Sequence, residues 1–262
     1  MPISDELGLR MKEYYEMRSR TSLMRRCPVA IRIDGKAFHT FTRGFDKPFD
    51  KVLGNAMVKT MKYLCENIQG CVLGYTQSDE ITLILIDYKK LTSDAWFDYE
   101  VQKMCSIAAS MATLAFNRYF DEEIVEAHKN PDFSSSKLCE AYMTSWNKGA
   151  MFDARCFNIP KEEVCNLIYW RQLDATRNSI QMVAQANFSH KELQGLNCNY
   201  LQDKLLVERN INWNNYETRW KRGVSCVRDA DGWKIDYEMP ILKGEDRKYV
   251  DDLIYIEDTM EA

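Results

Sequence analysis

The sequence predicts an α+β fold: a ferredoxin-like antiparallel sheet with helices on one face, followed by a mostly helical C-terminal region with a hairpin. Three observations predict it. Short apolar runs at 29–33, 71–75 and 81–86 have the length and composition of strands. A stretch with helical spacing, 53–68, lies between the first run and the second. This order of elements places the first strand beside the later hairpin in one sheet.

The first strand and the helix after it are defined by local signals. Residues 29–33 form a β-branched run that follows Pro28 and is too short for a typical helix. Gly35 comes shortly after the run and lets the backbone approach a ligand or metal closely. Asp50 stands where the N-cap of the helix is expected. One apolar stripe then recurs at spacings of three and four residues, and it consists of Leu53, Met57, Met61, Leu64 and Ile68.

The second and third strands are predicted to form a hairpin. Residues 81–86 are apolar at nearly every position, which indicates a strand that is buried on both faces. The preceding run, 71–75, is joined to it by Gln77-Ser78-Asp79-Glu80, which is therefore expected to be the tip of the hairpin.

Two carboxylates lie at the ends of these strands. Asp34 follows the first strand and Asp79 lies at the hairpin tip, so adjacent strands would bring them together. Two such carboxylates are the minimum needed to hold two Mg²⁺ ions against a triphosphate, as in a polymerase or cyclase palm. Alternatively, each is an ordinary turn residue, because Asp-Gly and Ser-Asp are common in turns. The pair together favours a nucleotidyl- or phosphoryl-transfer site.

The rest of the chain predicts further elements and one boundary. Residues 130–136 are the best linker candidate, which divides a palm catalytic region, 1–133, from a C-terminal region, 134–262, that packs on it as one compact unit. Helices and a second hairpin are expected at 95–120, 174–187, 199–210 and 225–237.

Composition excludes several classes of protein. Nine Cys without a Cys-x-x-Cys pair argue for a reducing compartment and against a zinc site. There is no glycine-rich phosphate loop of the P-loop type. Without a signal peptide or an apolar run of membrane-spanning length, a cytoplasmic protein is expected.

The charge distribution decides how an RNA partner is judged. A net charge of −4 counts against RNA, but residues 1–60 hold twelve Lys and Arg against seven Asp and Glu. Such a separation fits a basic surface on an acidic whole, although a solvated face that binds nothing would have the same charge. The candidate RNA contacts are Arg25, Arg26, Arg219 and Arg222.

Four strings resemble the tRNA-His guanylyltransferase-like family, whose members are 3′-to-5′ polymerases. They are 32–39, 77–80, 152–160 and 170–174, and they occur in the family's order. One string departs from the eukaryotic pattern, because the chain has Thr176 where those enzymes have His, and in the string that follows Asp174 it shares only Asn178 with them. The chain is therefore more similar to the bacterial and archaeal branch, which implies template-directed repair of tRNAs truncated at the 5′ end.

The resemblance implies roles for individual residues. Asp34 and Asp79 would be the catalytic pair and would hold two Mg²⁺ ions together with the Gly35 carbonyl. ATP would activate a 5′-monophosphorylated tRNA, and the 3′-OH of GTP or another NTP would then attack it. The enzyme would be a homo-oligomer, a tetramer as in the family. The nucleotide-binding residues would be Asp34, Gly35, Lys36, Ala37, Phe38, His39, Lys47, Ser78 and Asp79.

Three alternatives stay open at this point. The first is a nucleotide cyclase or dinucleotide synthase of the palm class, although Gln77 and Ser78 replace the glycines of its hairpin motif. The second is a tRNA-His guanylyltransferase proper. The third is an RNA-binding module without activity, against which the intact pair of acids argues.

Overall fold

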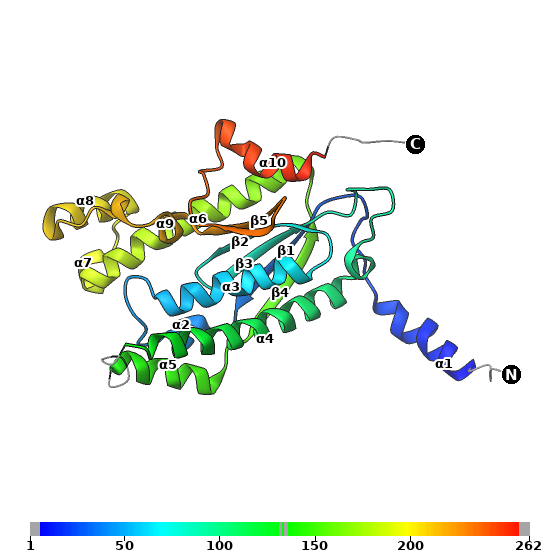
Figure 1. The fold of residues 1–262 in the computed structure, drawn as a ribbon, viewed down its shortest axis with the longest axis horizontal. Helices are drawn as coiled ribbons and strands as arrows, with labels where there is room; N and C mark the ends of the chain where they lie inside the picture. The colour runs from blue at the N-terminus through cyan, green and yellow to red at the C-terminus, as the bar shows by residue number, and fades with distance from the viewer. Residues whose placement is uncertain (1–5, 131–132, 134–135, 257–262) are drawn as a thin grey trace.

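Six strands form one sheet at the centre of the molecule, in the order β4-β1-β3-β2-β5-β6, and every neighbouring pair is antiparallel (Figure 1). This computed structural model describes residues 6–130, 133 and 136–256. The predicted α+β class is confirmed. The strands are β1 Val29–Gly35, β2 Cys71–Gln77, β3 Glu80–Leu85, β4 Phe152–Asn158, β5 Val224–Asp229 and β6 Gly232–Asp236.

The predicted strand, helix and hairpin are confirmed at the start of the fold. β1 lies beside β3, as expected, with Asp34 directly opposite Glu80. Helix α3 (Lys51–Asn67) begins at Asp50, whose side chain accepts a hydrogen bond from the Leu53 N–H. The predicted apolar stripe of α3 faces the sheet, and Met57, Met61 and Leu64 are fully buried.

Two helices cover one face of the sheet. α4 (Val101–Ala127) packs beside α3, and Ala108 and Ala112 are completely buried on its inner side. Small side chains allow two helices to approach closely. The expectation of a helix over 95–120 was wrong at its start, because Glu100 has an extended backbone and ends a separate 3₁₀ turn, Trp96–Tyr99.

Helices also cover the opposite face, which the sequence did not indicate. α6 (Lys161–Asn187) and α10 (Lys248–Ile254) bury apolar side chains against it, among them Ile168 against Ile84. The predicted helix 174–187 is the second half of α6. One long helix therefore runs over the back of the sheet and projects beyond it, where it forms a smaller core with α8 (Cys198–Arg209).

Strands from both sides of the predicted domain boundary share the sheet. β4 adds to the edge beside β1, and the predicted hairpin, now β5 and β6, adds beside β2. Within the proposed linker, residues 131–132 and 134–135 lie outside the described residues. The division at 133 stays a prediction.

The N-terminal segment projects from the body (Figure 1). Helix α1 (Glu6–Met11) has no buried residue, and neither have the two short turns that follow it, Lys12–Glu16 and Met17–Ser19. None of the described helices combines the length and apolar character needed to cross a lipid bilayer. The remaining helices are α2 Phe38–Phe41, α5 Lys137–Lys148, α7 His190–Leu193 and α9 Thr218–Arg222, with 3₁₀ turns at Trp213–Asn215 and Gly244–Arg247.

Candidate active site

Asp34 and Asp79 come together at one end of the sheet. Asp34 lies near the end of β1, and Asp79 lies in the two-residue turn between β2 and β3. The Gly35 N–H donates a hydrogen bond to the Asp79 carbonyl oxygen at 3.1 Å. Ser78 takes the left-handed backbone conformation, with φ of 51°, that makes so tight a turn possible. Two acids 45 positions apart in the sequence are thus joined through one backbone hydrogen bond.

Both carboxylates are costly to ionise in this position. Burial raises the pKa of Asp79, the hydrogen bond from Ser78 Oγ at 3.0 Å opposes that rise, and the nearby Asp34 carboxylate adds to it. Burial likewise raises the pKa of Asp34, and the carboxylates of Glu80 and Asp153 raise it further. A cation bound between Asp34 and Asp79 would relieve this repulsion.

The donor set at this point suits Mg²⁺. In the described part of the chain, no three His, Cys, Asp or Glu side chains converge into a metal-binding group. Mg²⁺ is nevertheless bound in many phosphoryl-transfer sites by only one or two carboxylates, with substrate phosphates and water completing its shell. The half-buried carboxylates of Asp34 and Asp79 match that pattern.

A cavity of about 510 Å³ opens beside the two acids. This volume lies within the range of small-molecule sites. Of the predicted nucleotide-binding residues, Asp34 and Lys36 are not part of its wall, and the Lys36 N–H instead donates to the Met151 carbonyl oxygen. The wall contains the other seven, Gly35, Ala37, Phe38, His39, Lys47, Ser78 and Asp79.

The loop after β1 has a tight conformation that depends on its residue types. A Cβ atom on Gly35 would lie 2.3 Å from Cδ2 of Phe38, a distance that no real Cβ contact reaches. The Phe38 ring cannot easily move, because it is buried and packs against the rings of Phe116 and Phe152. Ala37 completes the loop in the left-handed conformation, with φ of 55°. Gly35 therefore allows the backbone to pass directly over an aromatic core.

Four charged side chains tie this end of the sheet to α6. Glu80 Oε1 accepts from Arg32 at 2.7 Å, and Glu80 Oε2 accepts from Arg171 at 2.5 Å. Arg171 is almost completely buried and also donates to Asp174 at 2.6 Å. Arg171 and Asp174 belong to one of the four strings that predicted the family. Both carboxylate oxygens of Glu80 are engaged by these arginines.

Two arginines beside Asp34, Arg32 and Arg155, were not among the predicted site residues, and a tryptophan lies next to one of them. Arg32 lies directly opposite Arg155 of β4, and Asp34 lies directly opposite Asp153. Like charges facing each other across two strands are destabilising. Trp170 of α6 is half exposed, and its ring centroid lies 5.5 Å from Arg32 Cζ. The sequence contains Arg32-x-Asp34 in one string and Asp153-x-Arg155 in another. Only the register of β4 against β1 shows that these residues face each other.

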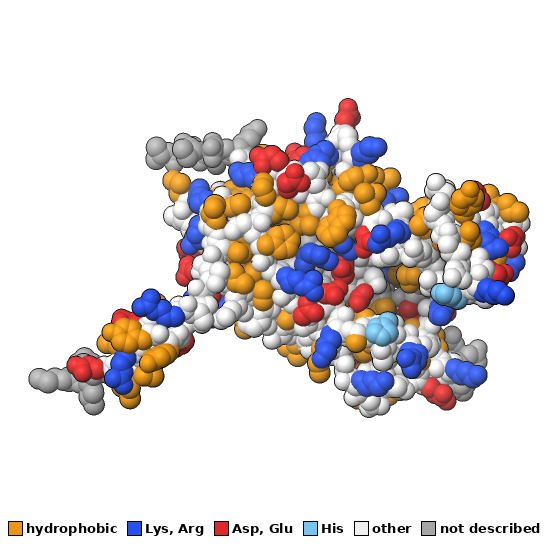
Figure 2. Space-filling view, turned by 180° about the vertical axis from the view of Figure 1, so that it is seen from behind, with side chains coloured by type: hydrophobic (Ala, Val, Ile, Leu, Met, Phe, Trp, Pro, Cys, Tyr) orange, Lys and Arg blue, Asp and Glu red, His pale blue; other side chains and the backbone are white. Residues whose placement is uncertain are grey.

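Figure 2 shows the opposite side of the molecule from Figure 1, and Lys and Arg side chains gather there with Asp and Glu in the middle of the face. Ion pairs join β1 to β3 and β3 to α6, and a further pair lies within β4. Apolar side chains border this charged region in the same view.

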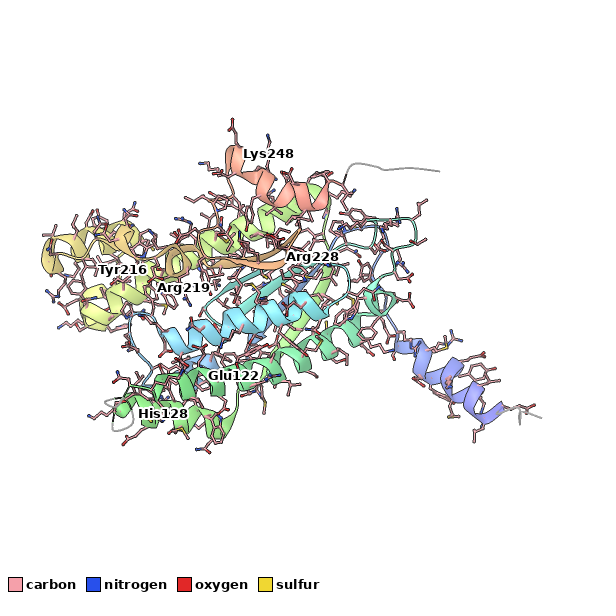
Figure 3. The ribbon with its side chains drawn as sticks, in the orientation of Figure 1. Glu122, His128, Tyr216, Arg219, Arg228 and Lys248 are labelled. Carbon is pink, nitrogen blue, oxygen red and sulfur yellow. The ribbon has the colours of Figure 1, made fainter. Side chains whose placement is uncertain are left out.

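The candidate RNA contacts separate into two places. Arg25 precedes β1, at the far end of the strand from Asp34, and its Nε donates to the fully buried Asp87 at 2.8 Å. Arg219 lies on α9 (Figure 3), and its Nη2 donates to Oδ1 of Asn55 on α3 at 3.0 Å. Arg26 accompanies Arg25 and donates its backbone N–H to Asp87, and Arg222 accompanies Arg219. Neither pair belongs to the wall of the cavity.

Comparison with known proteins places the chain among characterised relatives. A family model described as tRNAHis guanylyltransferase matches residues 9–160. A solved bacterial tRNA(His) guanylyltransferase-like protein in complex with ATP is 45% identical, with a TM-score of 0.83 over 95% of this chain and 100% of that one. A second such structure, in complex with GTP, is 40% identical, with a TM-score of 0.78 over 96% and 100%. An uncharacterised protein of Acanthamoeba polyphaga mimivirus is 32% identical, over 85% of this chain and 77% of its own.

Proposed function

The chain belongs to the tRNAHis guanylyltransferase family of nucleotidyltransferases, and we propose that it adds nucleotides to the 5′ end of tRNA by copying the opposite strand. One observation carries the proposal most directly. The paired carboxylates of Asp34 and Asp79 lie beside an open cavity, and two arginines, Arg32 and Arg155, lie next to the same Asp34. Joining two phosphorylated substrates requires an anion-binding surface for each of them.

The cavity is the proposed nucleoside triphosphate site. Gly35, Ala37, His39, Lys47 and Ser78 line it. The backbone N–H groups of this loop and the Lys47 ammonium would hold the phosphates. The two bacterial relatives were solved with ATP and with GTP, which supports the same two nucleotides as substrates here. Phe38 supports the loop from its buried position beneath it.

Asp34 and Asp79, with the Gly35 carbonyl, would hold Mg²⁺. Bound there, the metal would supply charge neutralisation for the triphosphate and a lower pKa for the attacking hydroxyl. The chain's own task is to place the two carboxylates, and the Gly35–Asp79 backbone hydrogen bond and the Glu80–Arg171 ion pair perform it.

The phosphorylated 5′ end of the tRNA is placed on the other side of Asp34. Arg32 and Arg155 would bind its phosphates, because guanidinium groups form strong, charge-assisted hydrogen bonds with phosphate oxygens. The exposed ring of Trp170 would stack on the terminal base, since aromatic side chains commonly hold splayed bases of RNA.

The reaction has two steps that balance. First, an oxygen of the tRNA 5′-monophosphate attacks the α-phosphorus of ATP, which forms an adenylylated 5′ end and releases pyrophosphate. Second, the 3′-OH of the incoming NTP loses its proton and attacks the 5′ phosphorus, and AMP leaves. Asp34 and Asp79 act in both steps because both are in-line displacements at phosphorus.

The choice of nucleotide is proposed to come from base pairing with the 3′ strand of the acceptor stem. Thr176 occupies the position of the eukaryotic histidine, and its hydroxyl donates to the Lys221 carbonyl oxygen at 3.1 Å. It is thereby used to join α6 to α9, and it offers no ring for RNA contacts. Repair of 5′-truncated tRNA is therefore favoured over recognition of tRNA-His alone.

The test uses α-labelled GTP, Mg²⁺ and a tRNA that lacks its first nucleotide. The base that faces the gap in the acceptor stem is C. Label that becomes RNA-linked at the 5′ end is the expected result, and it should depend on ATP when the RNA carries a 5′-monophosphate. A free cyclic product would instead mean a cyclase of the palm class. RNA binding without either product would mean an inactive binding module.

A further inference from the structure

We propose that Tyr142, on α5, is a positioning residue that holds the cavity loop, Phe45–Asp50, in its nucleotide-binding conformation. Tyr142 does not line the cavity, whereas Phe45, Asp46, Lys47 and Asp50 do. The inference rests on the proposed function, because it assumes that this cavity receives the nucleotide.

Asp50 is the point at which the loop is fastened. Its carboxylate is buried and accepts three hydrogen bonds. Oδ1 accepts from the Leu53 N–H at 2.8 Å, which starts helix α3. Oδ2 accepts from the Asp46 N–H at 2.9 Å, which closes the loop around Lys47. Asp50 thus fixes both the loop and the helix that follows it.

Tyr142 is the third donor to Asp50, and it comes from a distant part of the chain. Its hydroxyl donates to Oδ2 at 2.6 Å, while its ring meets the ring of Phe45 edge-on at a centroid distance of 4.7 Å. The side chain is 2% exposed. One residue of α5 therefore contacts the first residue of the loop through its ring and the last residue through its hydroxyl.

A second contact links α5 to the segment before the loop. Ser145 lies one turn after Tyr142 in the helix, and its hydroxyl donates to the Phe41 carbonyl oxygen at 2.5 Å. Ser145 is buried and is also absent from the cavity wall. Helix α5 therefore supports the nucleotide-binding segment from behind at two points.

Removal of the Tyr142 hydroxyl should weaken nucleotide binding more than catalysis. A hydrogen bond to a carboxylate is about twice as strong as one between neutral groups, so Asp50 would lose its strongest side-chain donor. Lys47 would then be held less firmly toward the phosphates. Asp34 and Asp79 lie on other elements and would keep their places, so kcat should change little.

The experiment compares Tyr142→Phe with Tyr249→Phe. Tyr249 is a matched control, because its hydroxyl also contacts a carboxylate, Asp236 Oδ2 at 2.9 Å, but it packs on the opposite face of the sheet. We expect Tyr142→Phe to raise the Kd for a fluorescent ATP analogue and the KM for ATP about tenfold, or 1.4 kcal/mol, with kcat within twofold. Tyr249→Phe should leave all three unchanged.

An unchanged Kd in folded Tyr142→Phe, or equal effects of the two substitutions, would overturn the inference. If circular dichroism shows that Tyr142→Phe is unfolded, Ser145→Ala is tested instead, and it should raise the Kd severalfold. An unchanged Kd in Ser145→Ala would then overturn the inference. Binding of the ATP analogue is measured without RNA. Wild-type protein that binds ATP but extends no RNA would therefore contradict the proposed function. The role of Tyr142 would still be decided by the Kd values of the variants.

Discussion

At the scale of single residues, a few positions of the site are electrostatically or sterically unfavourable. Asp34 and Asp79 are held near each other although burial and neighbouring carboxylates disfavour both charges. Gly35 lies over the Phe38 ring at a distance that excludes any side chain. Costs of this kind persist where the surrounding structure enforces them, and they concentrate at functional sites.

Replacing either acid by Asn should lower the activity of the enzyme without lowering its stability. Asp34→Asn or Asp79→Asn should lower the rate of nucleotide addition at least a hundredfold, since each tenfold corresponds to about 1.4 kcal/mol in the transition state. Each acid has a higher pKa in the folded protein than in the unfolded chain. Its contribution to the free energy of unfolding is therefore complete below about pH 4 and is lost as the pH rises through the raised pKa. An Asn side chain does not ionise, so the Asn variants do not lose stability in this way as the pH rises.

Melting curves in EDTA should therefore show a higher Tm for the Asn variants than for wild type at pH 7, and this difference should shrink near pH 4. Saturating Mg²⁺ should raise the Tm of wild type but not of the variants. A variant that keeps more than a tenth of the wild-type rate would contradict the assignment of the pair.

A methyl group at position 35 should disturb the same loop. Gly35→Ala would place Cβ 2.3 Å from the Phe38 ring, and such overpacking costs about 1–3 kcal/mol of unfolding free energy. Urea denaturation measures this cost. The neighbouring exposed Lys36→Ala should stay within about 0.5 kcal/mol of wild type. Equal stability of the two variants would mean that the loop is looser than described.

At the scale of elements, α6 connects the site to the rest of the fold. Arg171 is buried between Glu80, next to the hairpin tip, and Asp174 of its own helix. The same Asp174 also pairs with Arg177, which is 61% exposed. One carboxylate thus has a buried partner and an exposed one, which makes the two arginines directly comparable.

Arg171→Ala should lower the free energy of unfolding by about 3–5 kcal/mol, because it removes the buried guanidinium that Glu80 and Asp174 share. Arg177→Ala should lower it by about 1 kcal/mol or less, as is usual for exposed ion pairs. Guanidinium chloride denaturation of both variants measures the difference. Similar losses would mean that burial does not set the strength of these contacts.

Local signals explain which elements could be predicted. β1, α3 and the hairpin follow from strand and helix patterns within sixty residues, and they sufficed to bring Asp34 and Asp79 together. Arg155 opposite Arg32 could not be predicted, because it depends on the register of a strand about 120 residues away. The Tyr142–Asp50 hydrogen bond spans 92 residues and likewise arises only from packing.

At the scale of the whole molecule, the projecting segment, 6–19, buries none of its side chains. The projecting segment exposes 60% of Leu7, 56% of Leu9 and 67% of Tyr15. Isolated helices this short are unstable in water. We propose that a second copy of the chain covers these side chains, and the tetramer expected from the family resemblance is the assembly to test.

Light scattering after size-exclusion chromatography should therefore give the mass of a tetramer for wild type. Substitution of Tyr14 and Tyr15 by Ser should produce smaller species, since it removes two exposed aromatic rings from the projecting segment. Exchange of the exposed Asp203 for Ser on α8 serves as the control. A monomeric wild type would contradict this expectation.

The most direct test of the central claim is the identity of the nucleotide added to the 5′ end. Four tRNAs that lack their first nucleotide, with A, C, G or U opposite the gap, are incubated with all four NTPs, and full-length tRNA-His competes in the same reaction. We expect each tRNA to receive the complementary nucleotide, faster than G is added to tRNA-His. Addition of G whatever the opposing base, or tenfold faster extension of full-length tRNA-His, would contradict template-directed repair.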